Sequence, residues 1–165
     1  MADAAPEGGL LTLDGSFNSL PLRPQDGVGY VTRLISGPAA LAGVRTEFVA
    51  VVGDRPSLCA ASVVRPNETT FAITAQSGDD PFGPGRFAVG LGGQPGGVEV
   101  SVTRFGPSCL PADQYVSESG TVVITRVTAD AVLGTFEVTL AGDAGTLQGS
   151  FDVPLCAQPA ARCTP

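Results

Sequence analysis

Short runs of apolar and β-branched residues, separated by small polar turns, repeat along most of the chain and dominate its final third. Residues 119–156 read SGTVVITRVTADAVLGTFEVTLAGDAGTLQGSFDVPLC and contain three such runs. Apolar and polar positions alternate within each run, which is typical of strands that bury one face. The pattern therefore predicts an antiparallel meander in this part of the chain.

The alternation also predicts which side chains of the meander share a face, because successive residues of a strand point to opposite sides of a sheet. In the first run it separates one set of positions (Thr121, Val123, Thr125 and Val127) from another (Val122, Ile124 and Arg126). The second and third runs supply the residues expected to oppose them, namely Phe136, Val138, Leu140, Leu147, Phe151 and Val153.

Strand patterns also occur before the meander. Alternation and flanking turn residues predict strands over residues 10–17, 29–36, 44–54, 68–76, 86–93 and 97–105. One short helical turn is expected over residues 56–63, where Pro56 suits the first helical position and Asp54 can cap it. Residues 77–85, SGDDPFGPG, read as a loop.

No segment between these strands offers ten or more residues of helical periodicity, so parallel crossover units are excluded. We predict an all-β fold, a mainly antiparallel β-sandwich or flattened (calycin-like) barrel of about eight to ten strands. Residues 1–9 are predicted to be a flexible N-terminal tether, and residues 10–165 a single β domain.

Composition and charge narrow the range of partners. The chain has 22 glycines and 14 prolines, a formal net charge of −7, and nine basic residues that are all arginine and are not clustered. A surface of this kind should repel a polyanion, which excludes nucleic acid as a partner. No apolar run approaches the roughly 20 residues that a transmembrane helix needs.

The residues that carry chemistry are few. The chain contains no histidine, so it lacks the commonest general base and imidazole ligand, and no G-x-S-x-G motif is present. A glycosidase needs two carboxylates that face one another, and the spacing of the four candidates selects no such pair: Glu47, Glu99, Glu118 and Glu137. We therefore expect a protein that is not an enzyme and has no cofactor.

Two acidic turns and one sequon are candidates for a calcium site and a glycosylation site. Asp79, Asp80 and Asp143 lie in turns that could offer oxygen ligands to calcium, but none follows the spaced calcium-loop pattern. Asn67 begins an Asn-Glu-Thr acceptor for glycosylation, although an ordinary turn explains it better. We expect no metal at these positions.

The four cysteines indicate disulfides, because their number is even and no Cys-x-x-Cys pair is present. Of three possible connectivities, we predict Cys59 with Cys109 and Cys156 with Cys163. The second pair would close a short C-terminal loop and the first would bridge two loops far apart in the chain. Disulfides imply an oxidising compartment, so we expect an extracellular, periplasmic or outer-envelope location after export.

The first residues, MADAAPEGG, have neither a basic n-region nor an apolar h-region. They therefore contain no signal peptide. We expect the leader to have been removed from this chain, and the alternative is a cytosolic chain with free thiols.

Residues 53–61 read GDRPSLCAA, and residues 119–156 end in GTLQGSFDVPLC. These two stretches together resemble a family of small predicted secreted lipoproteins, frequent in myxobacteria, which has an S-D-x-P-G-L-C segment and the ending SGTVTLTxV…GSFDLTF…GTFDAPxC. The resemblance covers about residues 11–163. It implies an envelope location and an all-β domain but no reaction, and the lipidated cysteine of a lipoprotein N-terminus is absent here.

These observations favour a secreted or cell-envelope-associated, acidic, non-enzymatic binding or structural module. We expect a monomer whose partner is an unknown protein or small molecule. The alternative is a lipocalin-like carrier that holds a small apolar ligand inside a barrel.

Overall fold

The computed structural model describes the backbone of residues 10–15, 26–36, 43–53, 65–77, 82–90 and 96–156, and the side chains of the last three ranges. All regular structure in these ranges is β-strand. The strands are β1 (Leu10–Gly15), β2 (Asp26–Ser36), β3 (Gly43–Gly53), β4 (Thr69–Ser77), β5 (Gly85–Val89), β6 (Gly97–Phe105), β7 (Pro111–Val127), β8 (Ala131–Leu140) and β9 (Gly145–Pro154).

These strands form one sheet in the order β1-β9-β8-β7-β5-β6-β4-β3-β2, with a further pairing between β6 and β7. Neighbours are antiparallel except β5 and β6, which pair in parallel only at Ala88 with Gly97 and Val89 with Val98. No pairing joins β1 to β2 among the described strands, so the sheet is not closed. The prediction of an all-β, mainly antiparallel fold is confirmed, and the described strands form a single sheet that is not closed.

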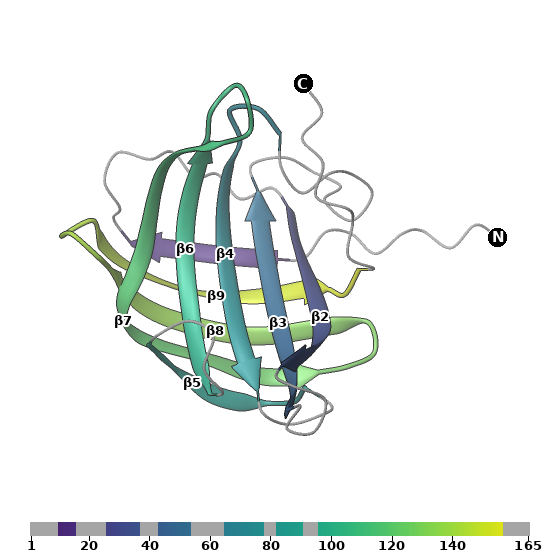
Figure 1. The fold of residues 1–165 in the computed structure, drawn as a ribbon. Coiled ribbons are helices and arrows are strands. Elements are labelled where there is room, and N and C mark those ends of the chain that lie inside the picture. Colours follow the sequence, from purple (N-terminus) through teal and green to yellow (C-terminus); the bar gives the residue numbers. More distant parts are fainter. Residues whose placement is uncertain are drawn as a thin grey trace.

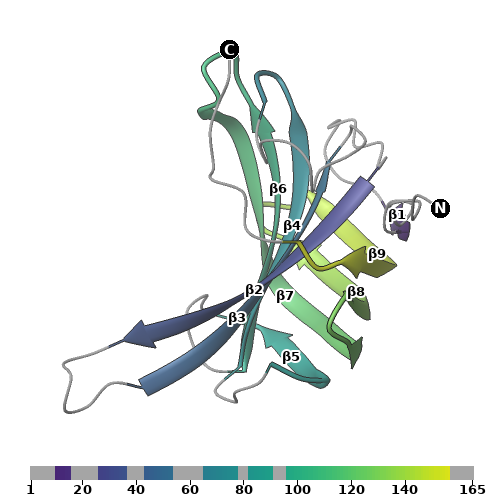
Figure 2. The same ribbon diagram turned by 90° about the vertical axis from the view of Figure 1, so that its right-hand side faces the viewer.

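Strand β7 makes the sheet fold over on itself. Its residues 111–116 pair with β6, and its residues 117–127 pair with β8, with register shifts between Ser117 and Ser119 and between Ile124 and Arg126. Figures 1 and 2 show the result: β6, β4, β3 and β2 form one layer, and β8, β9 and β1 run across it as a second layer. Bulges of this kind bend a strand and increase its twist.

Glycine is required at the bend. Gly120 has φ +126°, a region that residues with a side chain rarely enter, and an added Cβ would lie 2.2 Å from the Glu137 carbonyl oxygen. The opposing strand therefore approaches the β7 backbone too closely for any other residue.

The space between the layers is filled by apolar side chains. Phe71 and Phe136 come from opposite layers and pack with ring centroids 5.0 Å apart. The buried cluster draws on every strand from β4 to β9 and on two residues outside them: Phe71, Ile73, Ala75, Phe82, Phe87, Val98, Val100, Val102, Val122, Ile124, Val132, Phe136, Val138, Leu140, Ala144, Leu147, Phe151 and Val153. The alternation predicted for the meander is confirmed as far as Ile124 on β7 and along β8 and β9. It is wrong at the end of β7, where the register shift between Ile124 and Arg126 leaves Arg126 exposed and turns Val127 towards the core.

One expectation needs correction. The predicted meander begins at Ser119, whereas β7 already begins at Pro111 and continues to Val127 without a break. Residues 111–119 show no alternation of apolar and polar positions in the sequence, because all of their side chains are exposed or only partly buried. The predicted tether (residues 1–9) and helical turn (residues 56–63) lie outside the described residues.

Gly134 is a second position at which neighbouring atoms leave no room for a Cβ. Gly134 on β8 pairs with Phe151 on β9, and an added Cβ would lie 2.4 Å from the Val123 carbonyl oxygen and 2.5 Å from Phe151 Cζ. We expect Gly134→Ala to lower the free energy of unfolding by about 2–3 kcal/mol, because the added methyl overpacks a buried site.

Urea denaturation measures this loss. Gly83→Ala is the matched control, since an added Cβ there meets nothing within 4 Å. Equal stabilities for the two variants would contradict the packing of Phe151 against Gly134.

Candidate binding site on the outer face of the sheet

The outer face of β5, β7, β8 and β9 carries polar side chains in register. One cross-strand row joins Arg86, Val123, Thr135 and Ser150, and the next joins Ala88, Thr121, Glu137 and Gln148. These residues alternate with the buried ones, so the same periodicity that fills the core places polar groups outside.

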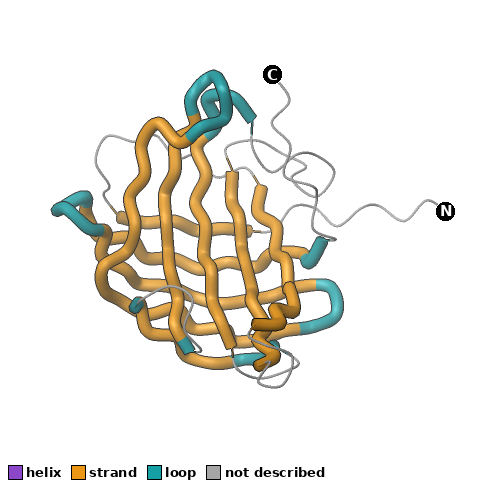
Figure 3. Tube along the Cα trace, in the orientation of Figure 1, coloured by secondary structure: helices purple, strands orange, loops and turns teal. Residues whose placement is uncertain are grey.

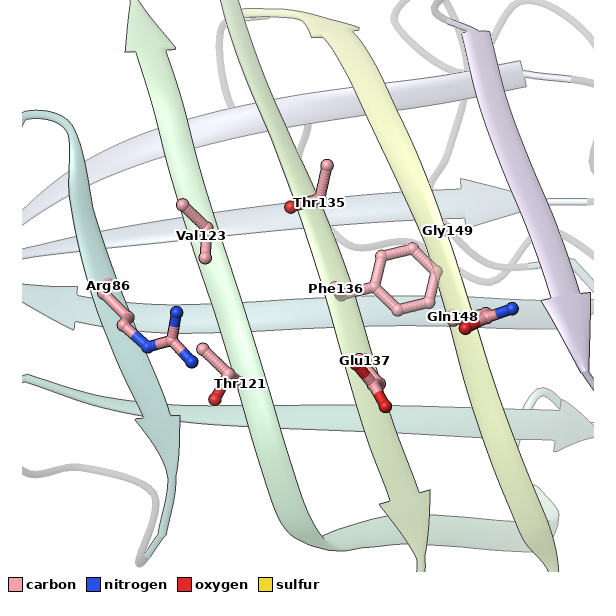
Figure 4. A pocket seen from close by; sticks show the side chains of 8 residues that line it. All are labelled: Arg86, Thr121, Val123, Thr135, Phe136, Glu137, Gln148 and Gly149. Carbon is pink, nitrogen blue, oxygen red and sulfur yellow. The ribbon is translucent and has the colours of Figure 1, made fainter.

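A shallow depression of about 480 Å³ lies over these rows, and we call it the outer depression. Figure 4 shows its lining side chains, which come from four neighbouring strands. The lining consists of Arg86, Thr121, Val123, Thr135, Phe136, Glu137, Gln148 and Gly149. Phe136 is buried in the core, so the outer side chains that a ligand would meet are mostly polar.

A second depression of about 280 Å³ adjoins the first and shares Arg86, Thr121 and Glu137 with it. Its other contributions come from the bend in β7 and from β8 and β9, and include Thr139 and Thr146. The two depressions therefore form one continuous polar surface, and Arg86 and Glu137 are its only charged lining residues in the part of the chain that the structure describes.

Arg86 and Glu137 face this surface from different strands and are both exposed. No ion pair joins them within the described part of the chain. In Figure 4 the Arg86 guanidinium extends from β5 towards Thr121 on β7. The guanidinium offers hydrogen-bond donors, the Glu137 carboxylate offers acceptors, and Gln148 and the threonine hydroxyls offer both. Their charges cancel, so the surface suits an uncharged polar molecule.

The structure places the four carboxylates considered for glycoside hydrolysis on different parts of the sheet. Glu137 lines the outer depression, whereas Glu99 lies on β6 and Glu118 lies at the bulge of β7, and neither lines it. Glu47 belongs to β3 and pairs in register with Gln76. Among the described residues the lining of the outer depression thus holds one carboxylate, Glu137, whereas general acid and base catalysis of glycoside hydrolysis needs two.

The predicted turn residues are found in turns where they are described. Asp143 lies in the β8–β9 turn with φ +57°, and Asn67 lies in the turn before β4 with φ +60°. No group of three or more potential metal ligands occurs among the described residues. Asp79 and Asp80 lie outside them.

The two cysteines that the structure describes, Cys109 and Cys156, are disulfide-bonded. Cys59 and Cys163 lie outside the described residues. The pairing of Cys59 with Cys109 and of Cys156 with Cys163 therefore stays a prediction.

Sequence reasoning named Glu137 only as one of four carboxylates and missed Arg86, Gln148 and Thr121. Each is an ordinary polar residue on the outer side of a strand. Their convergence depends on the β5–β7–β8–β9 register, which brings together residues up to 62 positions apart, from Arg86 to Gln148. No motif in the sequence encodes that register.

Comparisons with known proteins add no family assignment to this geometry. No helix in the described ranges is long and apolar enough to cross a membrane. The resemblance to secreted lipoproteins stays a prediction, because no family model, no curated protein and no solved structure matches the chain.

Proposed function

We propose that the chain is an exported, monomeric, non-enzymatic binding module that holds a small, uncharged, hydroxyl-rich molecule in the outer depression. The observation that carries this proposal is the polar lining contributed by Arg86, Glu137, Gln148 and neighbouring threonines on four adjacent strands. A saccharide is the ligand class that matches this chemistry best.

The charges of the site and of the whole chain support this ligand class. The opposite charges of Arg86 and Glu137 cancel each other, and the net charge of −7 on the chain disfavours an anionic ligand. Saccharide hydroxyls both donate and accept hydrogen bonds, so one sugar can satisfy the guanidinium, the carboxylate and the amide together. An apolar ligand would leave those groups without the water that now solvates them.

A carrier with an internal ligand has less support. The interior between the layers is occupied by large side chains, of which Phe71, Ile73, Ile124, Leu140 and Leu147 are less than 2% exposed. Interiors packed in this way leave few voids larger than a water molecule. A ligand that binds outside the sheet requires no rearrangement of this core.

Export is proposed on the cysteine chemistry. Cys109 and Cys156 are disulfide-bonded, and structural disulfides persist in oxidising compartments such as the periplasm or the extracellular space. The lipoprotein resemblance points to the same location. Mass spectrometry of a non-reduced digest of the protein isolated from its source tests this, and four free thiols there would overturn it.

A panel of immobilised neutral saccharides tests the ligand class. We expect the wild-type protein to be retained by at least one of them, and Arg86→Ala to weaken its binding by about 10–100-fold, because a charge-assisted hydrogen bond contributes about 1.5–3 kcal/mol. Gln148→Ala should weaken binding by a smaller factor.

Arg126→Ala is the control, because Arg126 is exposed on β7 but lines neither depression. Failure of every saccharide to bind, or equal loss in Arg86→Ala and Arg126→Ala, would contradict the proposed site.

A further inference from the structure

Strand β8 passes beneath both the outer depression and the depression of about 280 Å³ beside it, which we call the smaller depression. The outward residues of β8 here are Thr135, Glu137 and Thr139, which belong to three successive cross-strand rows. Of the two depressions, Thr135 lines the outer one, Thr139 lines the smaller one, and Glu137 lines both. The depressions therefore follow one another along β8 and meet at the row of Glu137.

The rows are spaced so that one sugar can touch two of them but not all three. Residues two apart on a strand lie about 6.5 Å apart along it, so Thr135 and Thr139 are separated by about 13 Å. A pyranose ring built from bonds of about 1.5 Å spans about 6 Å between opposite hydroxyl oxygens. A ring over Thr135 and Glu137 therefore leaves Thr139 without contact, and a second ring is needed to reach it.

The smaller depression offers the same kind of chemistry as the outer one. Its threonines, Thr139 and Thr146, pair in register across β8 and β9, and their hydroxyl groups can both donate and accept hydrogen bonds. Thr146 is exposed and Thr139 is partly exposed. The smaller depression thus suits a second uncharged, hydroxyl-rich ring.

From this arrangement we propose that the ligand is an uncharged oligosaccharide of at least two sugars, which lies along β8 with a glycosidic linkage over the row of Glu137. This inference rests on the saccharide binding proposed above and extends it. One sugar occupies the outer depression beside Thr135, and the next occupies the smaller depression beside Thr139 and Thr146.

The residues common to both depressions lie where the two sugars meet. They are Arg86, Thr121 and Glu137. Figure 4 shows the Arg86 guanidinium extending towards Thr121, and its several N–H groups can donate to hydroxyls of both sugars. Arg86 therefore contributes to the binding of every chain length, whereas Thr139 contributes only when a second sugar is present.

A shallow polar surface favours a chain over a single sugar. Each hydrogen bond to a sugar replaces one to water, so its net contribution to affinity is small. The second sugar of a chain adds its contacts after the first has already lost its free translation and rotation. We therefore expect a gain in affinity well above the roughly twofold statistical gain of a ligand with two equivalent sugars.

A chain laid across the strands would use other residues. The outer depression is lined by residues from β5 to β9, so a chain in that direction would stay within it and would not contact Thr139 or Thr146. The hydroxyl pair of the smaller depression favours the direction along β8, and the two directions differ in a measurable way.

Calorimetric titration with saccharides of increasing length tests the proposal. The probes are the monosaccharide and the di-, tri- and tetrasaccharide of the same sugar and linkage as the immobilised saccharide that retains the protein. We expect the disaccharide to bind at least tenfold more tightly than the monosaccharide. Thr139→Val, which removes one hydroxyl, should weaken disaccharide binding about three- to tenfold and leave monosaccharide binding unchanged.

Thr74→Val is the matched control, because Thr74 is a partly buried threonine on β4, in the other layer, and lines neither depression. It should bind every probe as the wild type does. Circular dichroism shows that both variants are folded, which is expected because valine and threonine have nearly the same shape.

The outcomes that overturn this inference differ from those that overturn the saccharide site itself. Equal affinity for the monosaccharide and the disaccharide would mean a site for one sugar. A length dependence that Thr139→Val leaves intact would mean a chain that runs across the strands. Either result overturns the proposed chain along β8 and leaves the proposed function standing, whereas failure of every saccharide to bind overturns both.

Discussion

Replacing Gly120 with alanine is expected to destabilise the protein more than the same change at Gly134 or Gly142. The new Cβ would lie 2.2 Å from the Glu137 carbonyl oxygen and 2.6 Å from Val138 Cα, and both of these are backbone atoms that cannot rotate away. The backbone must also leave φ +126°. We expect a loss of more than about 3 kcal/mol in the free energy of unfolding, as strain and clash add.

Thermal denaturation measures this effect, and a loss of that size lowers the Tm of a domain this long by about 10 °C. Gly142→Ala is the matched control. Gly142 also has a positive φ, +70°, but an added Cβ there meets nothing within 4 Å, so only the conformational cost of about 1 kcal/mol remains. Equal Tm values for the two variants would contradict the close approach of β8 to β7 at Gly120.

The second large effect is expected for Phe136→Ala. Phe136 is 4% exposed and its ring packs against Phe71 from the opposite layer. Truncation removes apolar contacts and leaves a cavity, so we expect a loss of about 3–5 kcal/mol. Urea denaturation gives this value from the shift of the midpoint at an unchanged slope.

Thr135→Ala is the control for this variant, because Thr135 neighbours Phe136 on β8 but is exposed. We expect it to change stability by no more than about 0.5 kcal/mol. A loss below about 1 kcal/mol for Phe136→Ala would mean that the two layers are not joined by a packed core.

The predictable part of the fold is the part in which one face of a strand is buried. For β8 and β9, strict alternation identified Phe136, Val138, Leu147 and Phe151 as inward residues, and all four are buried. The first half of β7 was missed because it is partly solvated on both faces, so its sequence, PADQYVSES, carries no alternation. Periodicity reports burial, and a strand without a buried face leaves no such signal.

The bend of the sheet was also beyond sequence reasoning. The register shifts around Glu118 and Thr125 depend on how β7 passes from β6 to β8, and Gly120 alone reads as an ordinary turn residue. The parallel contact between β5 and β6 also depends on the bend of the sheet, because the strand order places β5 between β6 and β7.

The candidate sites follow from this architecture. The outer depression exists because β5, β7, β8 and β9 align Arg86, Thr121, Glu137 and Gln148 in neighbouring rows. The loop between β6 and β7 lies at the end of the sheet (Figure 3), away from these rows. The packed core acts as the scaffold, and the proposed binding surface lies on its outside.

The most direct test of this account is to locate a bound ligand by nuclear magnetic resonance. The protein is labelled with ¹⁵N and titrated with the saccharide that retained it in the panel. The changes in backbone amide chemical shift are then mapped onto the strands. The account predicts that the largest shifts fall on Arg86, Thr121, Glu137 and Gln148, with the core residues Ile73 and Val100 unchanged. Shifts concentrated on those core residues would place the ligand inside the fold and contradict the account.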